Sequence, residues 1–142
     1  MPLCKALHNG KSFLVQALRQ AACRRLLSTR YTAAGSAGRT QAGQSEGPET
    51  FHRLRKQFIK YDLLIIDEWL LFPITEEDSQ LLLSLIDRRH DHQATIVASQ
   101  YEPAEWLDQI PIPVAAEAIT DRLSSQAYRI IIKGKKSMRD VN

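Results

Sequence analysis

The segment from Tyr61 to Glu68, with the sequence YDLLIIDE, constrains the fold more than any other part of this chain. Its centre is an unbroken apolar run from Leu63 to Ile66. Short runs of this kind are typical of strands that are buried on both faces, as in a parallel sheet. The run ends in two adjacent acids, Asp67 and Glu68. Because acids at the tip of a buried strand are unfavourable without a partner, we expect this pair to have a chemical task.

Such a pair is typical of nucleoside triphosphatases of the P-loop class, in which the pattern is called Walker B. In these enzymes the first acid holds Mg²⁺, directly or through water, and the second polarises the attacking water. The pattern therefore predicts that Asp67 helps to hold Mg²⁺ and that Glu68 activates water. The alternative is that the two acids only end the strand and cap the following turn.

A second motif, Gly-Lys-Ser at residues 10–12, opens an expected helix. In a P-loop, written G-x-x-x-x-G-K-[ST], backbone N–H groups surround phosphate, the lysine reaches the β and γ phosphates, and the hydroxyl binds Mg²⁺. The motif is only half present here, because Lys5 stands where the first glycine is expected and His8 where a further glycine is common. Residues 1–4 are also too few for the strand that leads into the loop, so we expect a sheet that is incomplete at its N-terminal strand.

Strand and helix patterns alternate over most of the chain, which predicts an α/β fold with a mostly parallel sheet. The stretch 32–50 contains four of the six glycines and no large apolar residue, and we expect it to be a disordered or irregular loop. Residues 1–142 are then one partial domain. The expected helices cover residues 10–27, 51–60, 75–89, 102–107 and 114–127, and the expected strands cover residues 28–31, 63–66, 94–98 and 128–133.

Charge is distributed unevenly along the chain. Residues 1–60 hold 11 Lys or Arg against two acids, whereas residues 61–142 hold 8 basic and 14 acidic residues. The basic half suits phosphate, either of nucleotide or of nucleic acid, although a solvated basic face is an equally good interpretation. Two cysteines are too few for a disulfide framework, and no apolar run approaches the roughly 18 residues that span a bilayer. We therefore expect a cytoplasmic location and no membrane association.

Several motifs together closely resemble one family, the IstB-like helper ATPases of bacterial insertion sequences, which are AAA+ relatives of the helicase loader DnaC. The resemblance is dense over residues 51–142 and recognisable over 10–31, whereas residues 32–50 do not resemble the family. The motifs that carry it are Gly10-Lys11-Ser12, Ala22-Cys23-Arg24-Arg25, LLIIDEW at 63–69, TIVASQ at 95–100, Asp121-Arg122-Leu123 and AYRIIIKGKKSMR at 127–139.

The resemblance implies an AAA+ three-layer fold and roles for individual residues. ATP and Mg²⁺ are the implied cofactors. Gly10, Lys11 and Ser12 would bind the phosphates, and Ser12 and Asp67 would hold the metal. Glu68 would orient the water. Ser99 and Gln100 lie where sensor 1 reads the γ-phosphate, with Gln100 as the better reader, and Arg122 matches the arginine finger offered to a neighbouring subunit's nucleotide.

The resemblance also implies partners: DNA, the transposase of the same element, and further copies of the chain in a homo-oligomer. Arg53, Arg55 and Lys56 are candidates for contacts with DNA phosphates. Each role has an alternative. Arg122 could pair with Glu117 or Asp121 on its own helix, and Ser99 and Gln100 could be ordinary loop residues.

Other interpretations concern side chains outside the expected site and the function of the whole chain. Arg88 and Arg89 suit a solvated helix end, and Trp69 and Trp106 suit packing. Two functions remain open beside the transposition helper ATPase. One is a non-catalytic remnant of such a protein, since a frameshift across residues 32–50 would explain the missing pattern there. The other is a DnaC-like helicase loader.

Overall fold

The protein forms a five-stranded parallel sheet with the strand order β2-β3-β4-β1-β5. The computed structural model describes residues 2–6, 10–33 and 55–132, with the backbone alone for residues 2–6 and 33. The strands are β1 (Pro2–Ala6), β2 (Thr29–Ala33), β3 (Leu63–Asp67), β4 (Ala94–Ser99) and β5 (Tyr128–Ile132).

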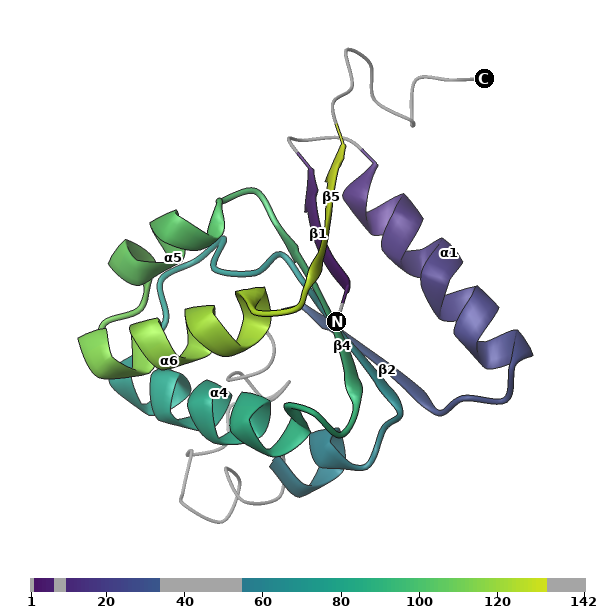
Figure 1. Ribbon diagram of the computed structural model, residues 1–142, viewed down its shortest axis with the longest axis horizontal. Coiled ribbons are helices and arrows are strands. Elements are labelled where there is room, and N and C mark those ends of the chain that lie inside the picture. Colours follow the sequence, from purple (N-terminus) through teal and green to yellow (C-terminus); the bar gives the residue numbers. More distant parts are fainter. Residues whose placement is uncertain (1, 7–9, 34–54, 133–142) are drawn as a thin grey trace, which may run out of the picture.

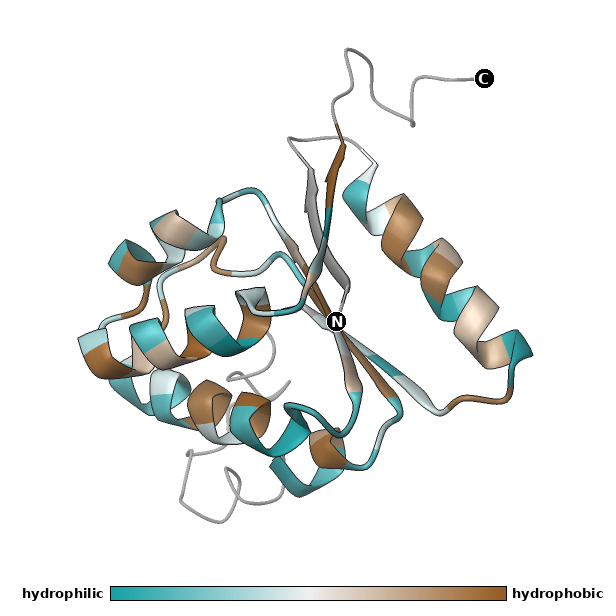
Figure 2. Ribbon diagram, viewed as in Figure 1, coloured by the Kyte–Doolittle hydropathy of each residue, from teal (hydrophilic) through white to brown (hydrophobic). Residues whose placement is uncertain are grey.

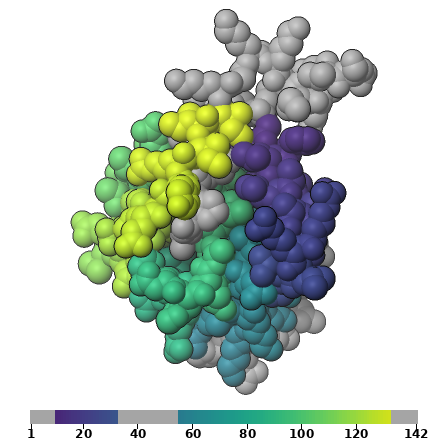
Figure 3. All heavy atoms as spheres, turned by 45° about the vertical axis from the view of Figure 1, so that its right-hand side comes forward, coloured from purple at the N-terminus to yellow at the C-terminus, as the bar shows by residue number. Residues whose placement is uncertain are grey.

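Helices cover both faces of this sheet, so that the domain has three layers. One face carries α1 (Lys11–Arg24), and the other carries α4 (Glu76–Arg89), α5 (Pro103–Gln109) and α6 (Pro113–Ser124), as Figure 1 shows. A further helical segment covers residues 55–59. In the space-filling view the purple and blue residues of α1 and β2 form one flank of the molecule, beside the green and yellow residues of the other layers (Figure 3). The predicted α/β class with a parallel sheet is confirmed.

The expectation of a missing N-terminal strand is wrong. Residues Pro2–Ala6 form β1 in the middle of the sheet, where Leu3 is opposite Val97 of β4 on one side and Arg129 of β5 on the other. The prediction assumed that Lys5 begins the phosphate loop, whereas the strand continues through Lys5 to Ala6. Both neighbouring strands therefore keep their hydrogen-bonded partner, and only residues 7–9, which lie outside the described residues, connect β1 to Gly10.

The centre of the sheet is apolar on both faces, as the run in β3 predicts. All five residues of β3 are buried, and successive side chains point to opposite faces. Leu63 and Ile65 pack with Val15 of α1, whereas Leu64 and Ile66 pack in the larger cluster beneath α4 and α6. Figure 2 shows the corresponding hydrophobic stripes on the sheet-facing helices. Burying each such side chain contributes about 1.5–3 kcal/mol, so β3 anchors both layers.

Most predicted elements are present, with shifts of a few residues at their ends. Strand β2 extends to Ala33, two residues into the segment predicted as a loop, and Thr32 is buried opposite Ile66. Residues 34–54, which include the rest of that loop and the start of the helix predicted at 51–60, lie outside the described residues. Thr75 is the N-cap of α4, as predicted, and forms a capping box with Asp78.

Arg89 does not belong to a solvated helix end. Its side chain is completely buried, and its guanidinium donates to the backbone oxygens of Phe58, Tyr61 and Ala94 and to the hydroxyl of Thr95. Burial lowers the pKa of this group to about 10, so the arginine remains charged at neutral pH. The charge is compensated by carbonyl dipoles, and Arg89 thereby connects α4 to the amino ends of β3 and β4.

Candidate nucleotide-binding site

The amino end of α1 has a geometry that suits an anion. Gly10, the N-cap residue, has φ 120°, a backbone conformation that favours glycine. The first turn of α1 contains no acidic residue, and no side chain among residues 10–32 and 55–132 caps the helix. The backbone N–H groups of this turn carry the positive end of the helix dipole, which suits phosphate. Lys11 and Ser12 are the first two residues of the helix, as in a P-loop.

Ser12 and Asp67, which are 55 positions apart in sequence, meet at the carboxyl end of β3. The Ser12 hydroxyl donates to Asp67 Oδ2 at 2.8 Å, and the backbone N–H of Glu68 donates to Asp67 Oδ1 at 2.8 Å. Asp67 is 3% exposed. The two halves of the predicted site, one from each motif, are therefore in direct contact.

These oxygen atoms fit Mg²⁺. The ion prefers oxygen ligands and is usually held by one or two protein groups, with phosphates and waters completing the shell. A hydroxyl and a carboxylate in contact match that demand. Within residues 10–32 and 55–132 there is no group of three or more His, Cys, Asp or Glu able to hold a metal.

Tyr31 is a site residue that the sequence analysis missed. Its hydroxyl, at the side of β2, donates to the same Asp67 Oδ2 atom at 2.5 Å. Burial, followed by the hydrogen bond to Asp67, raises the pKa of the Tyr31 hydroxyl above its ordinary value. No local pattern marks this tyrosine, because its role depends on the pairing of β2 with β3, in which Tyr31 is opposite Ile65.

Glu68 lies in the turn directly after β3. Its side chain is exposed, in contrast to that of Asp67, and its backbone has φ 54°. A non-glycine residue in this region costs free energy and is often found where function requires a fixed direction. The next residue, Trp69, continues the sheet by donating its N–H to the carbonyl of Ala98 at 2.9 Å. An exposed acid is thus held in place beside a buried one.

The hydroxyl of Ser99, at the end of β4, is engaged with the protein itself. It donates to the carbonyl of Trp69 at 3.2 Å and accepts from the N–H of Tyr101 at 3.0 Å and from Trp106 Nε1 at 3.3 Å. Ser99 is 2% exposed. Its contacts favour a structural task over the predicted contact with nucleotide. Gln100, the next residue, is partly exposed and remains the candidate reader of phosphate.

Trp69 and Trp106 are packing residues, as predicted. They are 0% and 1% exposed, and their rings meet edge to face with centroids 5.8 Å apart. Together with Ser99 they fix the loops that follow β3 and β4, which are the loops that carry Glu68 and Gln100.

Arg122 lies apart from the other predicted site residues. It is in the last turn of α6, and its guanidinium forms an ion pair with Asp87 of α4 at 2.9 Å, rather than with Glu117 or Asp121. It also lines a cavity of about 200 Å³ with His90, Gln93, Ala94 and their neighbours. Ala94 begins β4 and Ser99 ends it, so this cavity and the Ser12–Asp67 contact are at opposite ends of the strand.

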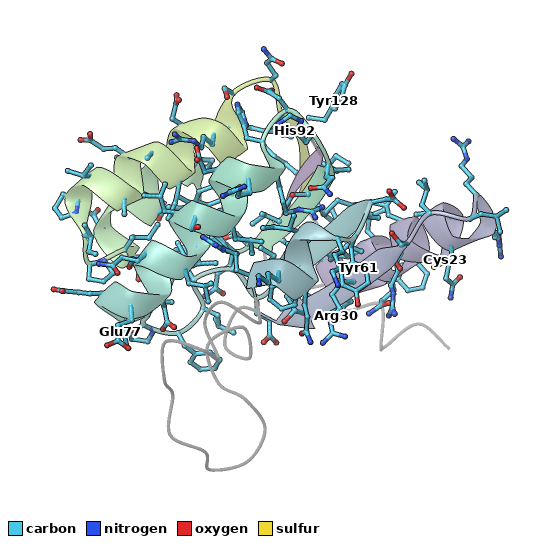
Figure 4. All side chains as sticks on the ribbon, turned by 90° about the horizontal axis from the view of Figure 1, so that it is seen from below. Cys23, Arg30, Tyr61, Glu77, His92 and Tyr128 are labelled. Atoms are coloured by element: carbon cyan, nitrogen blue, oxygen red, sulfur yellow. The ribbon has the colours of Figure 1, made fainter. Side chains whose placement is uncertain are left out.

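The basic residues named as DNA candidates have different environments. Arg55 donates to the Ser84 hydroxyl of α4 at 2.9 Å, which favours a structural role, whereas Lys56 is exposed. Arg53 lies outside the described residues. Arg30 is exposed on β2 with its guanidinium 5.9 Å from the ring centroid of Phe58, and it projects from the ribbon in Figure 4.

Comparison with known families gives a match over almost the whole chain. The family described as IstB-like ATP binding protein matches residues 4–142. The chain belongs to this family. A putative insertion sequence ATP-binding protein of Sinorhizobium fredii is 32% identical over 140 residues, which are 99% of this chain and 57% of the relative. This IstB-like chain thus spans little more than half the length of that relative.

Solved structures similar to the IstB-like chain share its fold. DnaI has a TM-score of 0.75 with 16% identity, over 94% of this chain and 74% of DnaI. The replication initiator DnaA, solved with AMPPCP and single-stranded DNA, has a TM-score of 0.67 with 15% identity, over 94% and 41% of the two chains. The fold is that of the P-loop AAA+ proteins.

In the part of the chain that the structure describes, no helix is long and apolar enough to cross a membrane.

The contacts of Ser99 generate a prediction that separates its two possible roles. Ser99→Ala removes a buried hydroxyl that joins Trp69, Tyr101 and Trp106. Because these groups lose their partner, we expect a fall of about 1–3 kcal/mol in the free energy of unfolding, measured with chemical denaturant. ATP affinity should change less than twofold. The control is Gln100→Ala, which should leave stability unchanged; an unchanged stability in Ser99→Ala with a large loss of ATP affinity would contradict this role.

Proposed function

We propose that this chain binds ATP together with Mg²⁺ as an ATP-binding helper protein of an insertion sequence. The observation that carries the proposal is the 2.8 Å hydrogen bond between Ser12, of the Gly-Lys-Ser motif, and Asp67, of the Walker B-like motif. Membership of the IstB-like family supports the nucleotide. The open helix end at Gly10 and the oxygen pair of Ser12 and Asp67 support the phosphate and the metal.

Each residue of the site has a task in this proposal. The first-turn N–H groups of α1 and the Lys11 side chain bind the phosphates. Ser12 and Asp67 hold Mg²⁺, which neutralises phosphate charge when bound. Glu68, which is exposed beside the buried Asp67, orients and polarises the attacking water. Gln100 senses the γ-phosphate from the end of β4.

Arg122 acts on a neighbouring copy of the chain in this proposal. Within one subunit it lies at the opposite end of β4 from the Ser12–Asp67 contact, so it does not complete its own site. Its guanidinium is partly exposed beside Asp87, and such a group can be offered to a second subunit. An arginine supplied in this way stabilises the charge of the phosphoryl-transfer transition state.

DNA and a transposase are the proposed partners of the assembled protein. The exposed Arg30 and Lys56 suit contacts with DNA phosphates, which depend on charge and weaken with salt. The names of the relatives connect the family with insertion sequences, and this connection supports a transposase as the partner.

The first prediction concerns ATP binding. We expect micromolar affinity for ATP in the presence of Mg²⁺, measured by calorimetric titration, and a loss of at least about 30-fold in Lys11→Ala, since a charged contact with phosphate is removed. The matched control is Lys56→Ala, which removes an exposed lysine elsewhere and should bind as the wild type does. Absence of ATP binding by the folded wild-type chain would contradict the proposal and favour the non-catalytic remnant.

A second prediction concerns the action of Arg122 on a neighbouring copy. Glu68→Gln lacks the water-activating acid but keeps Arg122, whereas Arg122→Ala keeps Glu68. Each variant alone should lose at least about 10³-fold in ATP hydrolysis, and a mixture of the two should regain part of the rate because mixed neighbours combine the intact groups. Asp87→Ala is the control, since it breaks the same ion pair but keeps the arginine. A mixture no more active than its components would contradict action between subunits.

A further inference from the structure

Tyr31 and Asp67 belong to neighbouring strands and point to the same face of the sheet. In the parallel pairing of β2 with β3, Tyr31 is opposite Ile65, and Asp67 is two positions further along β3. Side chains two positions apart in a strand share a face. Tyr31 accordingly packs against the cluster beneath α1, which includes Val15 and Ile65, and its hydroxyl reaches Asp67.

The buried carboxylate of Asp67 accepts hydrogen bonds on both of its oxygens. The backbone N–H of Glu68 binds Oδ1, while the hydroxyls of Ser12 and Tyr31 both bind Oδ2. A carboxylate with donors on both oxygens has little freedom to turn. Glu68 and Tyr31, which belong to the strands or the turn after them, hold the carboxylate in place. The carboxylate in turn sets the orientation of the Ser12 hydroxyl, which comes from α1.

The orientation of the Ser12 hydroxyl decides whether its oxygen is available to a metal. A hydroxyl has one proton and two lone pairs. When the Ser12 proton is directed to Asp67 Oδ2, the lone pairs remain free to bind a cation. If Asp67 turned, the proton would lose this acceptor and the hydroxyl would no longer be held ready.

We propose that Tyr31 is a positioning residue for the metal site. Its hydroxyl holds Asp67 Oδ2 in a place where this oxygen accepts a hydrogen bond from the Ser12 hydroxyl. The lone pairs of the Ser12 oxygen are then directed toward Mg²⁺. This inference rests on the proposed ATP·Mg²⁺ function and adds a residue that belongs to neither of the two sequence motifs. The Tyr31 hydroxyl is placed to donate to Asp67 by the pairing of β2 with β3.

Tyr31→Phe tests the proposal because it removes only the hydroxyl and keeps the ring in the core. ATP affinity is measured by titration at a series of Mg²⁺ concentrations and again in EDTA. The Mg²⁺ concentration that gives half of the metal-dependent gain in affinity should rise about tenfold, since partners of metal ligands typically contribute 10- to 100-fold to metal affinity. Affinity in EDTA should change less than twofold. A merely structural defect would instead lower the affinity equally in both conditions.

Tyr128→Phe is the matched control. Tyr128 is 75% exposed on β5 and projects from the surface in Figure 4, so losing its hydroxyl should leave the Mg²⁺ dependence unchanged. If Tyr31→Phe shows the same Mg²⁺ dependence as the wild type, the inference is overturned and the proposed function stands. If the wild-type chain itself shows no Mg²⁺-dependent ATP binding, both are overturned.

Discussion

The hydrogen bond between Ser12 and Asp67 is the contact on which the candidate site depends, because it joins two residues that are 55 positions apart in the sequence. Ser12 is placed by α1 and Asp67 by β3. The contact exists only because α1 packs its apolar face, with Val15, on the strand that ends in Asp67. The buried centre of the sheet therefore provides more than stability, since it sets the distance between a hydroxyl and a carboxylate.

The parallel sheet also explains why the candidate site residues gather at the carboxyl ends of the strands. The strands β3 and β4 run in the same direction, so the residues that follow them, Glu68 and Gln100, emerge together. The buried Ser99 and the two tryptophans stabilise the loops that follow β3 and β4. Arg122 lies near the opposite end of β4, where its guanidinium pairs with Asp87, and we propose that it acts on a neighbouring subunit.

Much of this fold could be predicted from local patterns. The run Leu63–Ile66 is apolar on both faces and marks a central strand, and Thr75 followed by three acids marks the start of α4. Ser12, Asp67 and Glu68 could be named as candidate site residues because each belongs to a motif with fixed spacing. These features depend on residues that are close in sequence, and such features can be recognised without a structure.

The failures concern interactions between distant segments. The five residues of β1 have little pattern of their own, and they form a strand because β4 and β5 supply partners on both sides. Arg89 resembles any basic residue at a helix end until the carbonyl groups of Phe58 and Tyr61 surround it. Tyr31 becomes a site residue only through the register of β2 on β3. No sequence window contains this information.

The most direct test of the central claim is a double-mutant cycle on Ser12 and Asp67, with Ser12→Ala, Asp67→Asn and their combination, read out as the Mg²⁺-dependent part of ATP affinity. If the two side chains hold one metal ion together, each single variant should lose most of the Mg²⁺-dependent gain and the double variant should lose little more. Losses that simply multiply in the double variant would mean that the two groups act independently, and the contact between them would not mark a shared site.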